Sequence, residues 1–217
     1  RWWFVECFHQ PMAHAIGEVN GVLELAGIKS CQSVPILSLD RHAAETVSSA
    51  LKKLTNLERP IALLCPFTRW PTKNWPISKF LALAEQLAED FQVVFTGSST
   101  DRPQIEEAIA EIPSVPAVNL AGRLSLLEFF ALAARSKVVV TGDSLPMHVA
   151  SAFDRPLVSL FGPTNEFLVG PRNDTAKMVR AAVDCQRCYR RRRCPRACID
   201  KITVDEVCTA VRSVLEQ

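Results

Sequence analysis

The run IALLCPFTRWPTKNWPISKFLALAEQL (residues 61–87) decides the fold, because a short buried strand, a proline-rich loop and an amphipathic helix follow one another within it. Five short apolar runs are predicted strands: residues 61–65, 92–96, 117–120, 137–141 and 156–161. The segments between them repeat apolar residues every three or four positions and are predicted helices: residues 77–90, 101–112, 125–136 and 146–153. Strands that are apolar on both faces and alternate with helices predict an α/β fold with a doubly wound parallel sheet.

Further elements are expected on both sides of this alternation. Before it, residues 13–26 predict a helix that ends at Gly27, residues 36–39 a short strand, residues 43–54 a helix and residues 56–60 a linker. The alternation is expected to stop after Thr175. Residues 203–215 then predict a terminal helix. Two capping boxes support the helix assignments, Ser125 with Glu128 and Thr203 with Glu206. Asp101 is expected to start the helix that contains Pro103.

The composition is that of a folded, water-soluble domain. The chain has 217 residues, of which 48% are hydrophobic and 22% charged, and its mean hydropathy is +0.09. These values exclude a disordered chain, and no apolar run approaches the roughly 20 residues that cross a bilayer. Nothing near the start predicts a signal peptide, and the apolar opening RWWFVECF without an initiating Met suggests a fragment.

Positive charge is concentrated in one segment. The net charge is +2, yet residues 184–201 alone carry seven basic and two acidic side chains. A protein that coats nucleic acid would show a broader basic stripe, so no nucleic-acid partner is expected. A local contact with an anion and a solvated basic loop are the two alternatives.

Eight cysteines without an export signal are expected to be reduced. Cys7, Cys31, Cys65 and Cys208 are scattered among apolar residues and predict core packing. Four others follow the spacing C-x2-C-x5-C-x3-C: Cys185, Cys188, Cys194 and Cys198. This spacing is compatible with four thiolates around zinc, and the alternatives are a reduced solvated loop or incidental pairing. A zinc-dependent nucleic-acid module is a weaker third reading of the same run.

Chemistry is expected where the winding of the sheet reverses, at the carboxyl ends of the strands. With the strand order 3-2-1-4-5, the loops at residues 66–76 and 142–150 meet there. In the first loop Thr68 and Lys73, with Arg69, stand between prolines and suit a phosphate. In the second, Asp143 and Ser144 occupy capping positions before Pro146, so a helix N-terminus would face the same anion.

The alternative for these residues is structural: Lys73 is solvated, Asp143 only caps the helix, and His148 is a satisfied helix histidine. The chain has no G-x-G-x-x-G after its first strand and no G-x-x-x-x-G-K-[ST], which disfavours the common dinucleotide and P-loop sites. It also lacks a D-x-D pair for a metal-bound diphosphate. Charge neutralisation would therefore fall to Lys73, to Arg69 and to helix dipoles.

A set of motifs resembles glycosyltransferase family 9, the heptosyltransferases of the bacterial lipopolysaccharide inner core. The motifs are TRWPTKNWP (68–76), VVFTGSSTD (93–101), NLAGRLSLLEF (119–129), VVVTGDSLPMHVASAFDRPLVSLFGPT (138–164) and CIDKIT (198–203). The resemblance implies the C-terminal half of a GT-B fold. Residues 1–58 would be the tail of the N-terminal domain and the interdomain linker. Residues 59–182 would be a Rossmann-like nucleotide-sugar-binding domain, and residues 183–217 a Cys/Arg-rich segment with a C-terminal helix.

The resemblance also implies a reaction, the inverting, metal-independent transfer of heptose from ADP-heptose to a lipopolysaccharide core acceptor. Thr68 and Lys73 would hold the diphosphate, Asp101 would approach the ribose and Leu124 would line the adenine pocket. Around the phosphates and the donor sugar would lie Asp143, Ser144, Leu145, Pro146 and His148. Lys73, Asp143 and His148 would be the catalytic set. The general base of such enzymes lies in the N-terminal domain, so this fragment alone is expected to be inactive.

One residue departs from the family pattern, because Leu145 stands where a glycine is usual. Its side chain would narrow the pocket, change the donor to another nucleotide sugar, or mark a non-catalytic nucleotide-binding relative. Apart from zinc at the cysteines, no cofactor is expected. The arginines of residues 190–193 would face the anionic acceptor or an anionic membrane surface. The resemblance implies a cytoplasmic protein at the inner face of the bacterial inner membrane.

Overall fold

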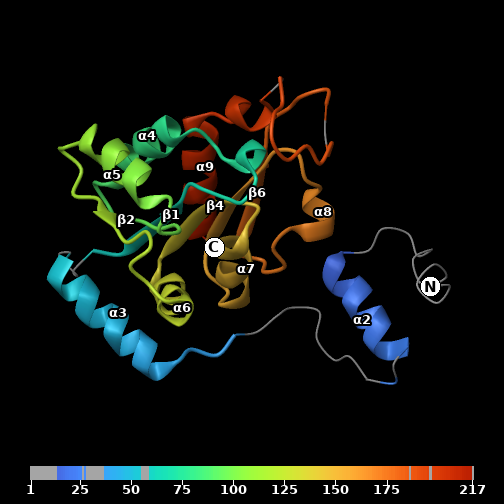
Figure 1. Cartoon of the computed structure of the whole chain (residues 1–217), viewed down its shortest axis with the longest axis horizontal. Coiled ribbons are helices and arrows are strands. Elements are labelled where there is room, and N and C mark those ends of the chain that lie inside the picture. Colours follow the sequence, from blue (N-terminus) through green and yellow to red (C-terminus); the bar gives the residue numbers. More distant parts are fainter. Residues whose placement is uncertain are drawn as a thin grey trace.

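Six parallel strands form one sheet in the computed structural model, which describes residues 14–25, 27, 37–54, 59–185, 187–195 and 197–216 (Figure 1). The strands are β1 (Ile61–Cys65), β2 (Gln92–Phe95), β3 (Val118–Asn119), β4 (Val138–Gly142), β5 (Leu157–Phe161) and β6 (Ala176–Arg180). Their order is β3-β2-β1-β4-β5-β6, so the predicted doubly wound, Rossmann-like α/β fold is confirmed. The winding reverses between β1 and β4, where Leu63 pairs with Val139.

Helices cover both faces of the sheet. They are α2 (Ala15–Leu25), α3 (Arg41–Leu54), α4 (Ile77–Leu87), α5 (Arg102–Ala110), α6 (Leu126–Arg135), α7 (Leu145–Ala152), α8 (Glu166–Val169) and α9 (Val204–Leu215), with 3-10 turns η1 (Pro71–Lys73) and η2 (Cys198–Lys201). Side chains of α4, α5 and α9 share one core with Ala62 and Leu64. Those of α3, α6 and α7 share another with Leu63. Alternate residues of β1 therefore face opposite layers, as expected of a strand buried on both sides.

Both capping boxes are present. At the start of α6 the Ser125 N–H donates to the Glu128 carboxylate at 2.7 Å, and the Glu128 N–H donates to Ser125 Oγ at 3.3 Å. At the start of α9 the Thr203 N–H donates to the Glu206 carboxylate at 2.7 Å, and Glu206 donates back at 3.2 Å. These hydrogen bonds lower the pKa of Glu128 and of Glu206. Because the two residues of each capping box are only three positions apart, both boxes could be predicted from a short stretch of sequence.

Two predictions about the elements were wrong. The alternation does not stop after Thr175, because Ala176–Arg180 forms β6 and pairs in parallel with β5. Its sequence, AKMVR, carries two cations and lacks the continuous apolar run of the other strands, since β6 is a partly exposed edge strand. The predicted strand at 36–39 is also absent: residues 37–40 lie in no strand, and Asp40 accepts a 2.7 Å hydrogen bond from the Ala43 N–H at the start of α3.

The segments on either side of the sheet domain pack against it. Val47 and Leu51 of α3 are buried in the core that α6 shares, and Val207 and Val211 of α9 are buried beside α4. The domain boundaries proposed from the sequence stay predictions. The first predicted helix is found as α2, while residues 13, 26, 36 and 56–58 lie outside the described residues. Within the described ranges no helix has the length and apolarity to cross a membrane.

Candidate functional site

A cavity of about 800 Å³ opens at the carboxyl ends of β1 and β4, at the point where the winding reverses. The loops after β1, β2 and β4 and the start of α6 line it. All nine site residues proposed from the sequence lie in this lining: Thr68, Lys73, Asp101, Leu124, Asp143, Ser144, Leu145, Pro146 and His148. The structure thus brings the whole set together, and the role of each residue stays a prediction.

The loop after β1 is held in place by its own hydrogen bonds. The Thr68 N–H donates to Asn74 Oδ1 at 2.8 Å, and the Thr68 hydroxyl donates to the Trp70 carbonyl oxygen at 3.0 Å. Lys73 ends the 3-10 turn η1, which starts with Pro71. Behind the loop, Trp75 is buried and donates its indole N–H to the Ile202 carbonyl oxygen at 2.9 Å. Lys73 therefore projects from a fixed backbone.

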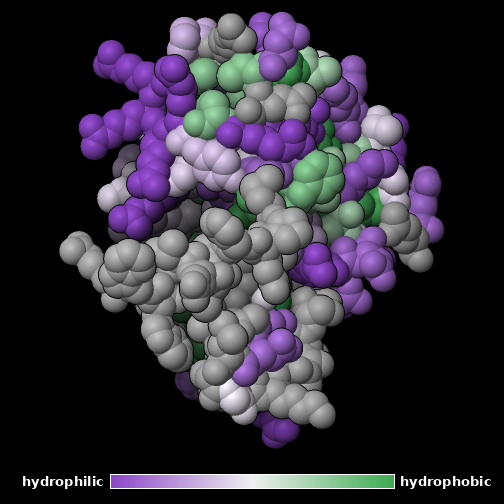
Figure 2. Space-filling view, turned by 90° about the vertical axis from the view of Figure 1, so that its right-hand side faces the viewer, coloured by the Kyte–Doolittle hydropathy of each residue, from purple (hydrophilic) through white to green (hydrophobic). Residues whose placement is uncertain are grey.

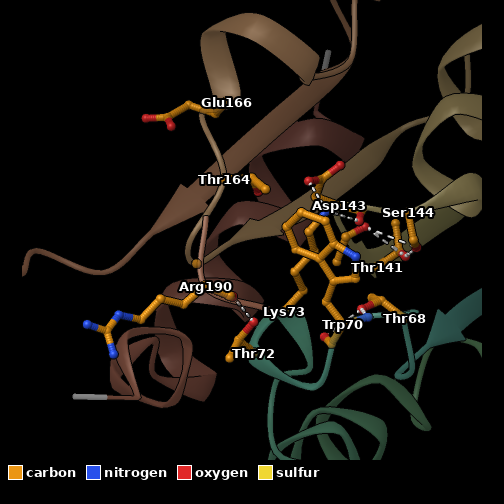
Figure 3. Close-up of polar contacts among 12 residues, drawn as sticks. Thr68, Trp70, Thr72, Lys73, Thr141, Asp143, Ser144, Thr164, Glu166 and Arg190 are labelled. Carbon is orange, nitrogen blue, oxygen red and sulfur yellow. Dashed lines mark hydrogen bonds and ion pairs between the residues drawn. The ribbon is translucent and has the colours of Figure 1, made fainter. Parts of the chain in front are cut away.

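Lys73 and Asp143 form an ion pair across the switch point (Figure 3). Lys73 Nζ lies 2.6 Å from Asp143 Oδ2 and 3.3 Å from the Asp143 carbonyl oxygen. The two side chains are only 13% and 7% exposed. This pair contradicts the alternative in which Lys73 is solvated and Asp143 only caps. The two loops approach closely because Gly142 lacks a side chain, since a Cβ there would lie 2.9 Å from the Lys73 carbonyl oxygen.

The N-terminus of α7 points its first turn at the same cavity. Ser144 is the N-cap, as expected, and Pro146 lies in the first turn. No side chain caps this end, since Ser144 Oγ lies instead 3.3 Å from Thr141 Oγ1 and 3.4 Å from the Gly142 carbonyl oxygen. The Leu145 N–H and the positive dipole end of the helix are therefore the groups that α7 offers to an anion, since Pro146 has no N–H and the Met147 N–H donates to the Ser144 carbonyl oxygen at 3.1 Å.

Two further side chains of α7 reach the cavity. Leu145 is 52% exposed and has helical backbone, a conformation that any residue adopts, so replacing the usual glycine causes no backbone strain. His148 lines the cavity, and within the described part of the chain its imidazole makes no hydrogen bond. It is therefore not the satisfied helix histidine of the structural alternative. Partial burial lowers the pKa of His148 below its ordinary 6.5 despite the opposing charge of Asp143.

The far end of the cavity is more apolar. Leu124, Leu126 and Phe129 line it at the start of α6. Asp101, which precedes α5 as predicted, folds back on its own loop: its Oδ2 accepts from the Ser98 N–H at 2.7 Å and from the Ser98 hydroxyl at 2.6 Å. The cavity therefore grades from a cationic end at Lys73 to an apolar end near α6, which suits a nucleotide with its base at the apolar end.

Trp70 is a lining residue for which no role was predicted from the sequence. Its ring centroid lies 4.2 Å from Lys73 Nζ and 4.6 Å from the guanidinium carbon of Arg191. Both distances are within the range of cation–π attraction. Its place between Thr68 and Lys73 in the proline-rich loop was the available signal, whereas the partner Arg191 is distant in sequence.

The four clustered cysteines lie away from the cavity lining. They are free thiols, with Cys198 buried and Cys188 exposed. Burial raises the pKa of Cys198, and the neighbouring Cys194 adds to this effect. Among the residues that the structure describes, no group of three or more His, Cys, Asp or Glu side chains is arranged to hold a metal ion. Cys65 and Cys208 are buried, which confirms core packing for these two, while Cys7 and Cys31 lie outside the described residues.

Comparisons with known proteins agree with the geometry of the site. Over 153 residues the chain is 39% identical to lipooligosaccharide heptosyltransferase 2 of Haemophilus influenzae, which covers 67% of the chain and 44% of that relative. Over 128 residues it is 40% identical to lipopolysaccharide heptosyltransferase 2 of Salmonella typhimurium, covering 57% and 37%. The solved structure of the E. coli ADP-heptose lps heptosyltransferase II superposes with a TM-score of 0.71 at 30% identity, over 84% of this chain and 54% of that one.

The chain therefore spans less than half the length of these two curated relatives. The model of glycosyltransferase family 9 (heptosyltransferase) matches residues 13–199, which is most of the chain. With the sheet order, the switch-point cavity and the sequence motifs in agreement, the chain belongs to glycosyltransferase family 9, the heptosyltransferases.

Proposed function

We propose that this chain supplies the donor site of a glycosyltransferase that transfers heptose from ADP-heptose to a lipopolysaccharide core acceptor. The observation that carries the proposal is the meeting of Lys73 with the N-terminus of α7 at the switch point. A diphosphate placed there would contact an ammonium group and the positive dipole end of α7, with its Leu145 N–H, at once. The solved relative at 30% identity is an ADP-heptose heptosyltransferase, which supports this donor. The chain would then be the C-terminal half of a GT-B enzyme.

The proposed chemistry is a displacement at the anomeric carbon of the heptose. An acceptor hydroxyl oxygen forms the new bond to that carbon while the bond to the ADP oxygen breaks, with inversion. The departing ADP takes the electron pair, and Lys73 and α7 would stabilise the negative charge that it gains. The hydroxyl proton would pass to a base supplied by the N-terminal domain. Asp143 would release Lys73 when the phosphates bind, and His148 would lie beside the donor sugar.

The remaining site residues would set the orientation of the donor. Thr68 would contact the diphosphate with Lys73, Asp101 would approach the ribose, and Leu124 would contact the adenine at the apolar end of the cavity. Since cations and N–H groups of the chain would meet the phosphate charge, we expect transfer to continue in the presence of EDTA. Zinc at the four cysteines stays a prediction, and metal analysis of the purified protein tests it.

Calorimetry with ADP-heptose, ADP and UDP tests the donor assignment, and heptose transfer by the intact protein tests the reaction. We expect ADP-heptose and ADP to bind and UDP to bind at least about 10-fold more weakly, since the base pocket is the part that distinguishes them. Preferential binding of UDP would point to another nucleotide sugar. The position of the protein in the cytoplasm, its acceptor and its contact with an anionic membrane surface stay predictions.

A second candidate is a nucleotide-binding relative without transferase activity. The exposed side chain of Leu145 in the cavity favours it, because that side chain occupies space where the family usually has none. Intact protein that binds ADP but transfers no sugar to any core acceptor would support this candidate. Restored transfer in Leu145→Gly would show that this side chain is the obstacle.

A further inference from the structure

Four consecutive arginines, residues 190–193, form an exposed run. We call this segment the arginine run. Arg191 approaches the cavity by lying over the ring of Trp70, whereas the Arg190 side chain points away from Lys73 and Asp143 (Figure 3). Within the described residues, no ion pair joins any of the four to a carboxylate. The neighbouring arginines differ, because Arg180 and Arg187 both contact the Glu166 carboxylate at 2.8 Å. Figure 2, which looks onto the side of the molecule that bears this segment, shows hydrophilic side chains protruding into solvent.

The backbone of the arginine run is anchored to the turn that carries Lys73 and to the loop after β5, through residues that lie outside the lining of the donor cavity. The Tyr189 N–H donates to the Pro163 carbonyl oxygen at 2.9 Å, in the loop after β5. The Thr72 hydroxyl donates to the Arg190 carbonyl oxygen at 2.5 Å, in the turn that carries Lys73 (Figure 3). The Arg187 pair with Glu166 holds the same segment from its other side. With three anchors around residue 190, the position of these positive charges is set by the fold.

Trp70 joins the arginine run to the donor cavity. Its ring lies within 4.6 Å of the Arg191 guanidinium and 4.2 Å of the Lys73 ammonium group, and it lines the cavity itself. Trp70 therefore lies between the buried Lys73–Asp143 pair and the exposed arginines. Inside the cavity Lys73 has a carboxylate partner, while outside it the arginines have none.

We propose that the arginine run is a second anion site at the mouth of the donor cavity, which binds phosphate or carboxylate groups of the acceptor saccharide. This inference rests on the proposed function. A guanidinium group presents paired N–H donors that match a phosphate or a carboxylate. The donor diphosphate would be held deeper, at Lys73, so charges at the rim are placed for the second substrate, which must approach the anomeric carbon from the open side.

The observations favour an acceptor over a membrane as the partner. Residues 184–201 are strongly basic while the rest of the chain is net acidic, and anionic bilayers also bind local clusters of four or more basic residues. The position of the segment, rather than its charge, distinguishes the two partners. The charged segment is fixed to the turn that carries Lys73, which is where a reacting acceptor has to lie.

The test uses the intact protein and a deacylated core oligosaccharide that keeps its phosphates and carboxylates, without lipid. The variant is Arg190→Gln/Arg192→Gln, which leaves Arg191 on Trp70, and the control is Arg212→Gln on the exposed side of α9. We expect the variant to bind this saccharide about 10-fold more weakly, as for two solvent-exposed charged contacts. Its affinity for ADP stays within two-fold of wild type, which also shows that it is folded. Where transfer is measured, KM for the acceptor rises while kcat changes little.

Removal of the phosphates and reduction of the carboxyl groups of the saccharide should abolish the difference between the variant and wild type. Equal affinity of the two proteins for the anionic saccharide overturns the proposal. So does a defect that is confined to acylated acceptor on vesicles of anionic lipid, which would indicate membrane docking instead. Because saccharide binding is measured without turnover, a wild-type protein that transfers no heptose refutes the proposed function while the binding result still decides this inference.

Discussion

Replacement of Lys73 by methionine should weaken ADP binding by more than the loss of one contact. Lys73 is a cation of the proposed diphosphate site, and it also neutralises Asp143, whose side chain is only 7% exposed. In Lys73→Met the carboxylate of Asp143 stays in the site without its partner. The incoming phosphates then lose an attractive charge and meet a repulsive one.

The two effects can be estimated from the geometry. A hydrogen bond to a charged group contributes about 1.5–3 kcal/mol. A phosphate in contact with Lys73 would lie roughly 5 Å from Asp143, because Nζ is 2.6 Å from the carboxylate oxygen on its other side. At an effective dielectric constant of about 20, two unit charges at roughly that separation repel by about 3 kcal/mol before screening. Salt and water reduce this repulsion, so we expect a total loss of about 2–4 kcal/mol, or roughly 30- to 1000-fold in Kd.

Isothermal titration calorimetry with ADP at physiological salt measures this change. The double variant Lys73→Met/Asp143→Asn removes the unpaired carboxylate and should recover about 10-fold of the lost affinity. Lys137→Met, an exposed lysine just before β4 at the opposite end of the sheet, is the matched control and should bind ADP as wild type does. The reasoning is refuted if Lys73→Met binds ADP within three-fold of wild type, or if the double variant binds no better than the single one.

Three other changes test the site and the packing around it. Protonation of His148 would add positive charge to the site and so favour binding of an anion. Because burial lowers the pKa of His148, this stronger binding should appear only below about pH 6.5. ADP binding by wild type should strengthen there relative to His148→Gln, as calorimetry from pH 5.5 to 8 would measure, and parallel pH profiles would contradict this role. Ser125→Ala should cost about 1 kcal/mol in urea unfolding, because the capping box of α6 is lost, and an unchanged midpoint would count against it. Glu166→Gln should destabilise the protein by about 3 kcal/mol at pH 7, because two arginines lose a buried partner. Burial by itself would raise the pKa of Glu166, but hydrogen bonds and both arginines lower it overall, so its stabilisation exists above the ordinary value of 4.5 and is lost as pH falls below it. The difference between Glu166→Gln and wild type should therefore shrink towards pH 3, and a constant difference would show that the carboxylate charge is not responsible.

The strands that could be predicted are those that carry their own signal. β1, β4 and β5 are buried along their whole length, so each is a continuous apolar run between breaks in the sequence. β6 has no such signal. It is half-exposed, it carries Lys177 and Arg180, and its position is set by pairing with β5 and by packing of α9. An edge strand of this kind depends on distant parts of the chain, which local patterns do not report.

The candidate site shows the same division between local and distant signals. Its place followed from the strand order, because parallel strands bring their following loops to one edge of the sheet. The contacts that its side chains make could not be predicted from the strand order. Asp143 reads locally as a helix cap, yet its carboxylate pairs with Lys73, which is 70 positions away. The contact of Trp70 with Arg191 spans a greater separation still, so nothing in the loop around Trp70 could indicate it.

The ion pair of Lys73 with Asp143 would give the proposed diphosphate site a means of selecting its ligand. An anion that contacts Lys73 must compete with the Asp143 carboxylate for the ammonium group. Weakening that ion pair costs binding free energy, because the two charges are largely shielded from water. A small anion that contacts only Lys73 would gain little binding free energy, because it replaces one ion pair of Lys73 with another. A diphosphate would gain more, because its second phosphate would reach the Leu145 N–H and the positive dipole end of α7 while the first contacts Lys73. In the proposed site Asp143 would therefore disfavour ligands that make a single contact. Its carboxylate opposes every anion, and only a ligand that makes several contacts would offset the loss of the ion pair.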